Sequence, residues 1–337
     1  MQEKLKIIFF CGERSPWGVA HLRPLLAHPQ LQTVAVIFAT PARWETFRTA
    51  LSGPSPTVSR LRKTWRRFRA RGREDNPQRV AQLVEEHGVP LVYCDDVNRQ
   101  DSVASFAEYG ADVAFSAAYP QLFGEDLLSR WSPRIYNSHP SLLPKFRGAH
   151  PVFWAVAKGA TETGGSIHVM TAELDQGDVV AARPVPILET DVYRDVYDKL
   201  VQLVPDLFDG FVDFLRDTNA RGKPQDPAQA SYFRNDRAIH RRISWLQFAA
   251  EEVHNLVRAC DSRAFFFAED REIRVLRTSW SPTNHNMTND VQVPPGTVVD
   301  VIDDQPVVAA RDGFVRLEQI RQSLRRAVVF RIGQILS

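Results

Sequence analysis

The twelve residues NSHPSLLPKFRG, from Asn137 to Gly148, place an amide and an imidazole two positions apart. Asn137 offers an N–H donor that does not ionise, and His139 can take or release a proton near neutral pH. Asp175 follows in a second segment, TAELDQGD, in a glycine-containing loop after a predicted strand. These three groups suit attack on a carbonyl group. The amide would stabilise the oxyanion, the imidazole would move the proton, and the carboxylate would orient the imidazole.

A covalent nucleophile is not expected. Ser141 lacks the G-x-S-x-G turn that exposes a serine nucleophile. The nucleophile is therefore expected to be the substrate itself. The spacing alone leaves a second interpretation open, because Asn-x-His pairs also arise by chance and His139 could be a structural histidine.

The elements that would position these groups alternate between strand and helix. Asn137 and His139 fall at the carboxyl end of a predicted strand, where sites of parallel sheets usually lie. The alternation predicts an α/β fold with a Rossmann-like, mostly parallel sheet covered on both faces. Pro205 is expected to bend or interrupt the last of these helices. The predicted strands cover residues 6–12, 33–39, 91–94, 111–115, 134–137, 166–171 and 179–187, and the helices cover 19–27, 102–109, 151–158, 192–215 and a segment opening at 76–77.

The amino-acid composition of the chain changes after the long predicted helix. Residues 1–217 are expected to form the catalytic domain, 218–230 a linker and 231–337 a second domain. A helical stripe over 243–260 precedes short strands with turn signals, which predicts a small β-barrel of the OB-like kind. Those strands cover residues 264–268, 272–278, 296–302, 306–310 and 314–319.

Composition limits the class of protein. The 337 residues are 44% hydrophobic and 24% charged with a net charge of +2, which is ordinary for a soluble globular protein and names no partner. Three widely separated cysteines predict neither a disulfide framework nor a zinc site and favour a reducing, cytoplasmic location. No apolar run reaches the roughly 18 residues of a membrane span, so no membrane partner is expected.

Residues 137–178 resemble the formyltransferases that use 10-formyltetrahydrofolate. The resemblance assigns catalytic roles to Asn137, His139 and Asp175, and implies transfer of a formyl group to an amine without a metal. Residues from about Tyr232 onward, through Ile243 to Trp245 and Pro295 to Thr297, are similar to the C-terminal barrel of methionyl-tRNA formyltransferase and its amino-sugar relatives. The matching pieces are Asn137 to Pro144, Arg147-Gly148, Pro151, Gly159, Thr161 to Gly164, Ser166 to His168 and Leu174 to Asp178.

The resemblance also implies a folate cleft beside the three catalytic groups. Backbone groups of its two walls would pair with the pterin, and Leu122 and Leu174 would pack on the ring. Plain core packing is the alternative for these two leucines. The walls are formed by Ala118, Tyr119, Pro120, Gln121 and Leu122 on one side, and by Glu173, Leu174 and Asp175 on the other.

The sequence leaves two classes of acceptor amine open. A segment that begins at Arg60 and ends at Arg73 holds eight basic residues, two aromatic residues and no acid, as a tRNA-binding loop would, although a solvated surface fits equally well. His168 and the DDVN segment at 95–98 are more similar to enzymes that act on small amines, such as amino-sugar nucleotides or hydroxyornithine. A small-molecule amine is therefore the favoured substrate, and initiator Met-tRNA is the alternative.

Three residues are expected to contact that substrate: Ser141, Lys145 and Arg147. The two cations could hold a phosphate or carboxylate group, with surface solvation as the alternative. The C-terminal barrel would either grip the substrate or serve as a packing module or homodimer interface, and its sequence does not choose between these.

Four other activities compete. A formyl-folate hydrolase would use water in place of the amine. A dinucleotide oxidoreductase fits poorly, because Gly12 and Gly18 do not form G-x-G-x-x-G. An RNA-binding module would leave the three polar groups unexplained. A metal hydrolase lacks an H-E-x-x-H pairing, although suitable ligand types occur at His139, His150, His168, Asp175 and Asp178.

Overall fold

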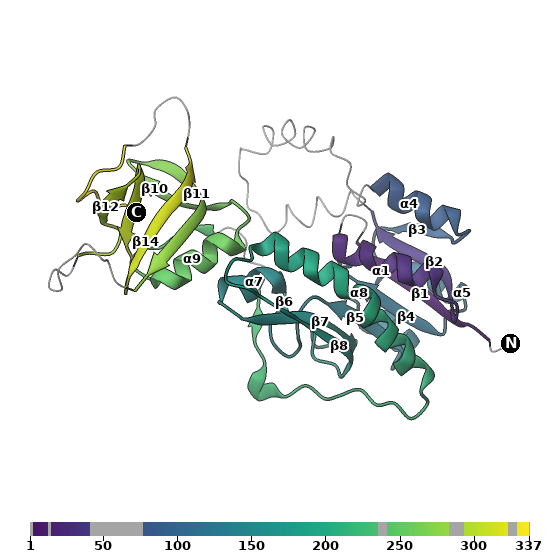
Figure 1. The fold of residues 1–337 in the computed structure, drawn as a ribbon. Coiled ribbons are helices and arrows are strands. Elements are labelled where there is room, and N and C mark those ends of the chain that lie inside the picture. The colour runs from purple at the N-terminus through teal and green to yellow at the C-terminus, as the bar shows by residue number, and fades with distance from the viewer. Residues whose placement is uncertain are drawn as a thin grey trace. The chain divides into compact units, whose positions relative to one another are not determined.

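A computed structural model of the protein describes residues 3–12, 15–40, 77–234, 241–282, 293–322 and 329–336 (Figure 1). The basic segment from Arg60 to Arg73, and Asn76 before the second predicted helix, lie outside the described residues. The chain divides into two compact units, and the predicted domain boundaries remain a prediction. The first unit comprises Met1–Pro144, Gly165–Arg183 and Val201–Ala228, and the second comprises Lys145–Gly164, Pro184–Leu200 and Gln229–Ser337.

A seven-stranded sheet forms the centre of the first unit. Its strand order is β3-β2-β1-β4-β5-β7-β8, in which the first five strands are parallel and β7 runs antiparallel to β5. The order reverses between β1 and β4, which is where doubly wound sheets bind their ligands. The strands are β1 (Leu5–Cys11), β2 (Leu31–Ala39), β3 (Leu91–Cys94), β4 (Val113–Ala117), β5 (Ile135–His139), β7 (Glu162–Val169) and β8 (Val179–Pro186).

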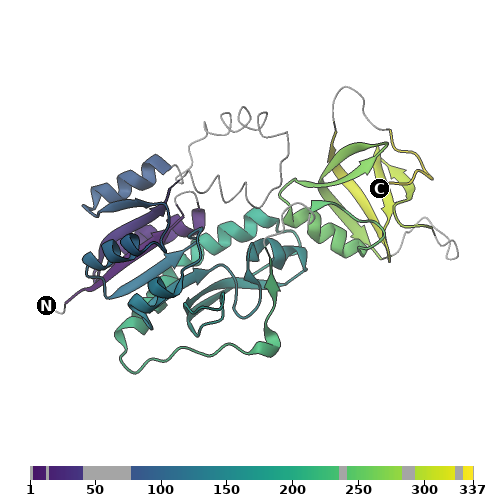
Figure 2. The same ribbon diagram turned by 180° about the vertical axis from the view of Figure 1, so that it is seen from behind.

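Helices cover both faces of this sheet, as Figures 1 and 2 show for α1 and α8 on one face and α5 on the other. Phe115 of β4 stacks on Phe211 of α8, whereas Phe10 of β1 meets Phe106 of α5 on the opposite face. Alternate strand residues thus fill two separate apolar layers. The helices are α1 (Pro16–Ala27), α4 (Pro77–Glu86), α5 (Gln100–Glu108), α6 (Glu125–Trp131) and α8 (Tyr193–Arg216).

Two helical details differ from the sequence-based expectation. Helix α6 was not predicted, because its seven residues are too short for a clear apolar stripe. Pro205 was expected to bend or interrupt the long helix, yet α8 continues through it from Tyr193 to Arg216. Its buried apolar face, which includes Leu207, holds the helix against the sheet despite the lost backbone hydrogen bond.

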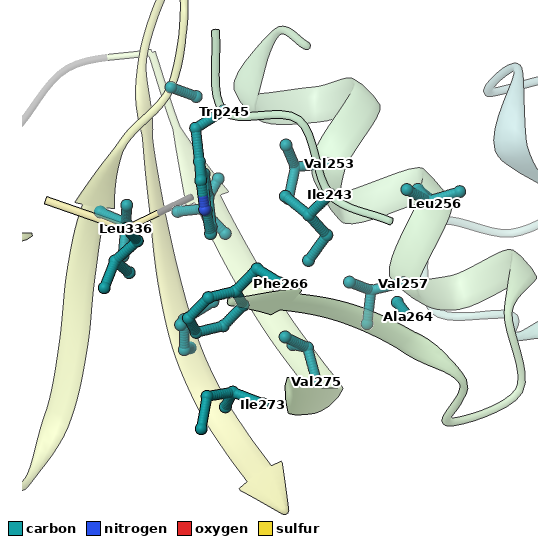
Figure 3. Close-up of a cluster of buried hydrophobic side chains, with 14 of the residues drawn as sticks. Ile243, Trp245, Val253, Leu256, Val257, Ala264, Phe266, Ile273, Val275 and Leu336 are labelled. Carbon is teal, nitrogen blue, oxygen red and sulfur yellow. The ribbon is translucent and has the colours of Figure 1, made fainter. Parts of the chain in front are cut away.

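The second unit contains a five-stranded antiparallel sheet of order β10-β11-β14-β13-β12. Figure 3 shows its buried side chains, with Phe266 among Trp245, Ile273 and Leu336. The unit also holds the short parallel pair β6 (Arg147–Gly148) and β9 (Tyr232–Phe233), and α7 (Pro151–Ala157) packed against α9 (Ala250–Ala259). The sheet strands are β10 (Ala264–Ala268), β11 (Arg271–Ser281), β12 (Val298–Ile302), β13 (Gln305–Ala309) and β14 (Phe314–Arg321).

The predicted helix over 243–260 was too long. Helix α9 begins only at Ala250, because the N–H of Ile243 donates to the carbonyl of Phe265 at 2.7 Å and holds the preceding segment out of the helix. The predicted fold class, a mostly parallel α/β sheet followed by a small antiparallel β domain, is confirmed. None of the described helices is both long and apolar enough to cross a lipid bilayer.

Candidate active site

Strand β5 ends with the two residues that the sequence singled out. Asn137 and His139 are two positions apart, so both side chains leave the same face of the strand. Ile135 on this face packs in the apolar layer formed with α5 and α6, so Asn137 and His139 lie on the face of the sheet that these two helices cover. In the antiparallel ladder Asn137 stands opposite His168 of β7, and His139 stands opposite Ser166.

Asp175 comes from the loop that joins β7 to β8. Its backbone is left-handed, with φ of 57°, a conformation that aspartate tolerates better than most residues. Gly177 lets the loop fold tightly back, because a Cβ atom there would stand 1.9 Å from the carbonyl oxygen of Val169. The amide of Gln225 donates to the carbonyl oxygens of Asp175 and Gly177, at 2.9 and 2.7 Å. The loop is therefore held at Asp175 and at Gly177.

The carboxylate of Asp175 faces two imidazoles. Its Oδ2 lies 3.7 Å from Nδ1 of His139, and its Oδ1 lies 3.5 Å from Nε2 of His168. All three side chains are at least 93% buried, so water screens the carboxylate only weakly. Since Nδ1 of His139 faces the carboxylate, Nε2 is the ring nitrogen that can exchange a proton with a substrate.

His168 lies beside both the carboxylate of Asp175 and the amide of Asn137. Its Nδ1 lies 2.8 Å from the carbonyl oxygen of Val169, and a carbonyl only accepts, so this nitrogen carries a hydrogen. In a neutral His168 ring, Nε2 is then an acceptor, 3.3 Å from Nδ2 of Asn137. One N–H of the amide can bond to His168 while the second is left for a substrate oxygen.

The structure thus brings Asn137, His139 and Asp175 together, as the sequence predicted from their types. What the sequence reasoning missed is His168 as the fourth member, and Gln225 as the support of the Asp175 loop. His168 was noted as part of the matching motif, as a subfamily marker and as a possible metal ligand, but not as a partner of Asn137 and Asp175. Gln225 was placed in a linker. Both contacts cross large sequence separations of 31 and 50 residues, so no local pattern contains them.

The first predicted folate wall follows β4 at the strand-order reversal. Leu122 is 71% exposed, as is typical of an apolar side chain that contacts a ligand. The side chain of Gln121 instead ties this loop to the one after β3, because it accepts from the N–H of Val97 and donates to the carbonyl of Asp95. The side chain of Gln121 is thus hydrogen-bonded within the protein, so Gln121 would contact a folate through its backbone.

Tyr119 in the same wall is partly buried and packs against the core. Its ring meets Phe10 and Phe123 edge to face, and burial raises the pKa of its hydroxyl group. That hydroxyl is buried and has no hydrogen-bond partner within the part of the chain that the structure describes. Ala118 is exposed and has a left-handed backbone, with φ of 52°, while Pro120 is half-buried.

The second predicted wall is the Asp175 loop. Leu174 is 39% exposed beside the buried carboxylate, and Glu173 is exposed with its carbonyl oxygen accepting from the hydroxyl of Thr171. Each wall thus presents one exposed leucine. The predicted folate contacts remain predictions.

The three predicted substrate contacts differ in their surroundings. Ser141 is fully buried, and its carbonyl accepts from the hydroxyl of Ser166 at 2.7 Å, so it would reach a substrate only if the loop moved. Lys145 is exposed and Arg147 is half-buried in strand β6, both in the second unit. Their roles in substrate binding remain predictions. Among the described residues, no group of three His, Cys, Asp or Glu side chains could hold a metal ion.

The comparison with known families names the class. Residues 5–208 match the family described as formyl transferase, and residues 237–330 match the formyl transferase C-terminal domain. The chain therefore belongs to the formyl transferase family, a family of enzymes, which confirms the resemblance read from its motifs.

Individual relatives agree with this assignment. The chain is 33% identical over 197 residues to the methionyl-tRNA formyltransferase of Thermotoga sp. (strain RQ2), a match that covers 58% of this chain and 62% of the relative. It thus spans about three fifths of the length of the curated relatives that it matches first.

Two solved structures share the fold at low identity. WlaRD, a sugar 3N-formyl transferase solved with dTDP and 5-N-formyl-THF, has a TM-score of 0.60 at 16% identity and covers 97% of this chain and 100% of its own. An N-formyltransferase from Helicobacter canadensis, in complex with folinic acid and dTDP-3-aminofucose, has a TM-score of 0.59 at 14% identity and covers 93% and 98%.

Proposed function

We propose that the protein transfers the formyl group of 10-formyltetrahydrofolate to a primary amine, with Asn137, His139 and Asp175 as its catalytic residues. The observation that supports this most strongly is the convergence of the three side chains. The buried carboxylate stands 3.7 Å from the imidazole of His139, and the amide of Asn137 lies at the same strand end. The folate as co-substrate is supported by the two solved relatives, each of which was crystallised with a formyl-folate.

Each group has one task in the reaction. The neutral amine attacks the formyl carbon, and the N–H of Asn137 that His168 leaves free donates to the oxyanion that forms. His139 takes the proton of the attacking amine at Nε2, and Asp175 stabilises the resulting imidazolium. The carbon–nitrogen bond to the folate then breaks, the folate nitrogen takes the proton from Nε2 of His139, and a formamide and tetrahydrofolate leave.

The folate would lie between the exposed leucines of the two walls. Leu122 and Leu174 are large apolar side chains that stand 71% and 39% exposed. Packing on a flat heteroaromatic ring would remove that surface from water. Backbone groups of residues 118–122 and 173–175 would pair with the ring edge.

The acceptor that we propose is a small-molecule amine, such as an amino-sugar nucleotide or hydroxyornithine. The observation in its favour is the histidine at position 168, because this residue resembles the pattern of enzymes that act on small amines. His168 lies beside both Asn137 and Asp175. Ser141, Lys145 and Arg147 are the proposed acceptor contacts. The three cysteines of the chain are buried and form no disulfide, which supports a reducing, cytoplasmic location for the reaction.

Initiator Met-tRNA is the second candidate acceptor, because the relative that is 33% identical is a methionyl-tRNA formyltransferase. A panel of acceptors separates the candidates. Formyl-acceptor tRNA, amino-sugar nucleotides and hydroxyornithine are each incubated with 10-formyltetrahydrofolate, and tetrahydrofolate release is followed over acceptor concentration. Saturable turnover with one small amine supports the proposal, and turnover with tRNA alone favours the alternative. Formate release without any amine would identify a hydrolase, and no turnover at all would refute formyl transfer.

A further inference from the structure

Ser138 lies between Asn137 and His139 on β5, and its side chain points to the opposite face of the sheet. There it meets helix α1. The indole N–H of Trp17 donates to the carbonyl oxygen of Ser138 at 3.0 Å, and the hydroxyl of Ser138 is 2.9 Å from Nε2 of His21. Both the backbone and the side chain of Ser138 are therefore bonded to α1.

The direction of these hydrogen bonds follows from the partners of His21. Its Nδ1 lies 2.7 Å from the carbonyl oxygen of Trp17, which can only accept, so Nδ1 carries the hydrogen. Nε2 of the neutral ring is then an acceptor, and the hydroxyl of Ser138 donates to it. Burial lowers the pKa of His21 to about 4, so the ring is neutral under ordinary conditions.

The three residues are buried and closely packed. Trp17 is 1% exposed, His21 is 0% exposed and Ser138 is 2% exposed. The His21 ring is enclosed by the rings of Trp17, Phe115 and Phe208, with centroid separations of 4.9, 5.5 and 6.5 Å. A buried polar group that loses its partner is costly, so the set is held together as a unit.

We infer that Trp17, His21 and Ser138 are positioning residues that brace the end of β5 from behind and so hold the Asn137 amide and the His139 imidazole at their working positions. This inference rests on the proposed function of those two side chains. The planar peptide group that holds the carbonyl of Ser138 also holds the backbone nitrogen of His139, and the preceding peptide group joins Ser138 to Asn137. A shift of the Ser138 backbone therefore moves both neighbours. A misplacement of about 1 Å in an active site can cost about a hundredfold in rate.

The test compares two variants that each remove one buried hydroxyl bonded to a histidine. Ser138→Ala removes the hydroxyl on His21. Thr278→Val removes the hydroxyl that is 3.0 Å from Nδ1 of His254 in the second unit, where no catalytic residue is proposed. Both are expected to lower the denaturation midpoint. Only Ser138→Ala is expected to lower kcat, by roughly tenfold or more, with KM for folate and amine within about twofold of wild type.

Two further variants keep the result interpretable if Ser138→Ala folds poorly. Ser138→Thr retains the hydroxyl and should restore most of kcat. Trp17→Phe keeps an aromatic ring but removes the indole N–H donor, and should lower kcat without raising KM. Wild-type kcat in well-folded Ser138→Ala and Trp17→Phe would overturn the inference.

A second readout does not depend on formyl transfer. Amide hydrogen exchange of the peptide that spans 135–141 should become faster in Ser138→Ala and stay unchanged in Thr278→Val. If the wild-type protein transfers no formyl group, the proposed function fails. The exchange measurement alone then tests whether Trp17, His21 and Ser138 hold the end of β5 in place. Equal exchange in the two variants would overturn the inference.

Discussion

Replacing Asp175 with asparagine should lower kcat by two to three orders of magnitude while leaving the fold intact. Asparagine has nearly the same volume and tolerates a left-handed backbone as well as aspartate does, so φ of 57° is not strained by the change. The variant therefore removes the charge that faces His139 and His168 and changes little else.

The magnitude follows from the separation of the charges. Oδ2 of Asp175 is 3.7 Å from Nδ1 of His139. Two unit charges at that distance attract by about 4.5 kcal/mol at an effective dielectric constant of about 20. That energy corresponds to about three decades in rate, as an upper limit that applies when the proton is fully on His139 in the transition state. Partial proton transfer reduces the loss to about two decades.

The assay is steady-state tetrahydrofolate release at saturating folate with the best acceptor of the panel. Asp178→Asn is the matched control, because Asp178 is an exposed aspartate of the same loop region. The control should retain kcat within about twofold, since exposed charges are screened by water. A well-folded Asp175→Asn enzyme with kcat within threefold of wild type would refute the electrostatic role of the carboxylate.

Three other changes have defined outcomes. Gln225→Ala should lower kcat roughly tenfold with unchanged KM, because the two bonds to the Asp175 loop are lost; an unchanged kcat would contradict this. The folded-state pKa of His21, about 4, is below its unfolded value, so the unfolded chain binds the extra proton and stability falls as pH drops from 6.5 toward 4. In His21→Gln, the decrease in the free energy of unfolding over this pH range should be smaller by up to about 3 kcal/mol, as measured by urea unfolding. The same pH dependence in the variant and the wild type would contradict this. Gly148→Ala should destabilise the protein by at least about 1 kcal/mol in the same assay, because φ there is 90° and a Cβ atom would stand 2.3 Å from the carbonyl of Phe233; an unchanged midpoint would contradict it.

Most of the strands were predictable because their signals are local. The run Ile7 to Cys11 is fully buried in β1, and an uninterrupted apolar run of this length predicts a strand of a parallel sheet. The start of α9 was not predictable in the same way. Residues 243–249 fit the helical period, but a contact between Ile243 and Phe265 decides their conformation.

The site shows the same limit. The types of Asn137, His139 and Asp175 indicated attack on a carbonyl group, which stays a prediction. The resemblance of the motifs predicted the family, which is confirmed. The register that sets His168 opposite Asn137 depends on how β7 pairs with β5, which the local sequence does not specify. The polar composition of residues 218–230 predicted a linker, yet Lys223 in it exchanges two backbone hydrogen bonds with Val179.

The most direct test of the central claim is the single-turnover rate of formyl transfer in Asn137→Ala and His139→Ala, measured with preloaded 10-formyltetrahydrofolate and saturating amine. Each variant is expected to fold normally and to transfer the formyl group at least roughly a hundredfold more slowly than wild type, as loss of an oxyanion donor or a general base predicts. Asn219→Ala, which alters an exposed asparagine, should retain the wild-type rate. A near-normal rate in either active-site variant would contradict the assignment of these side chains as the catalytic groups.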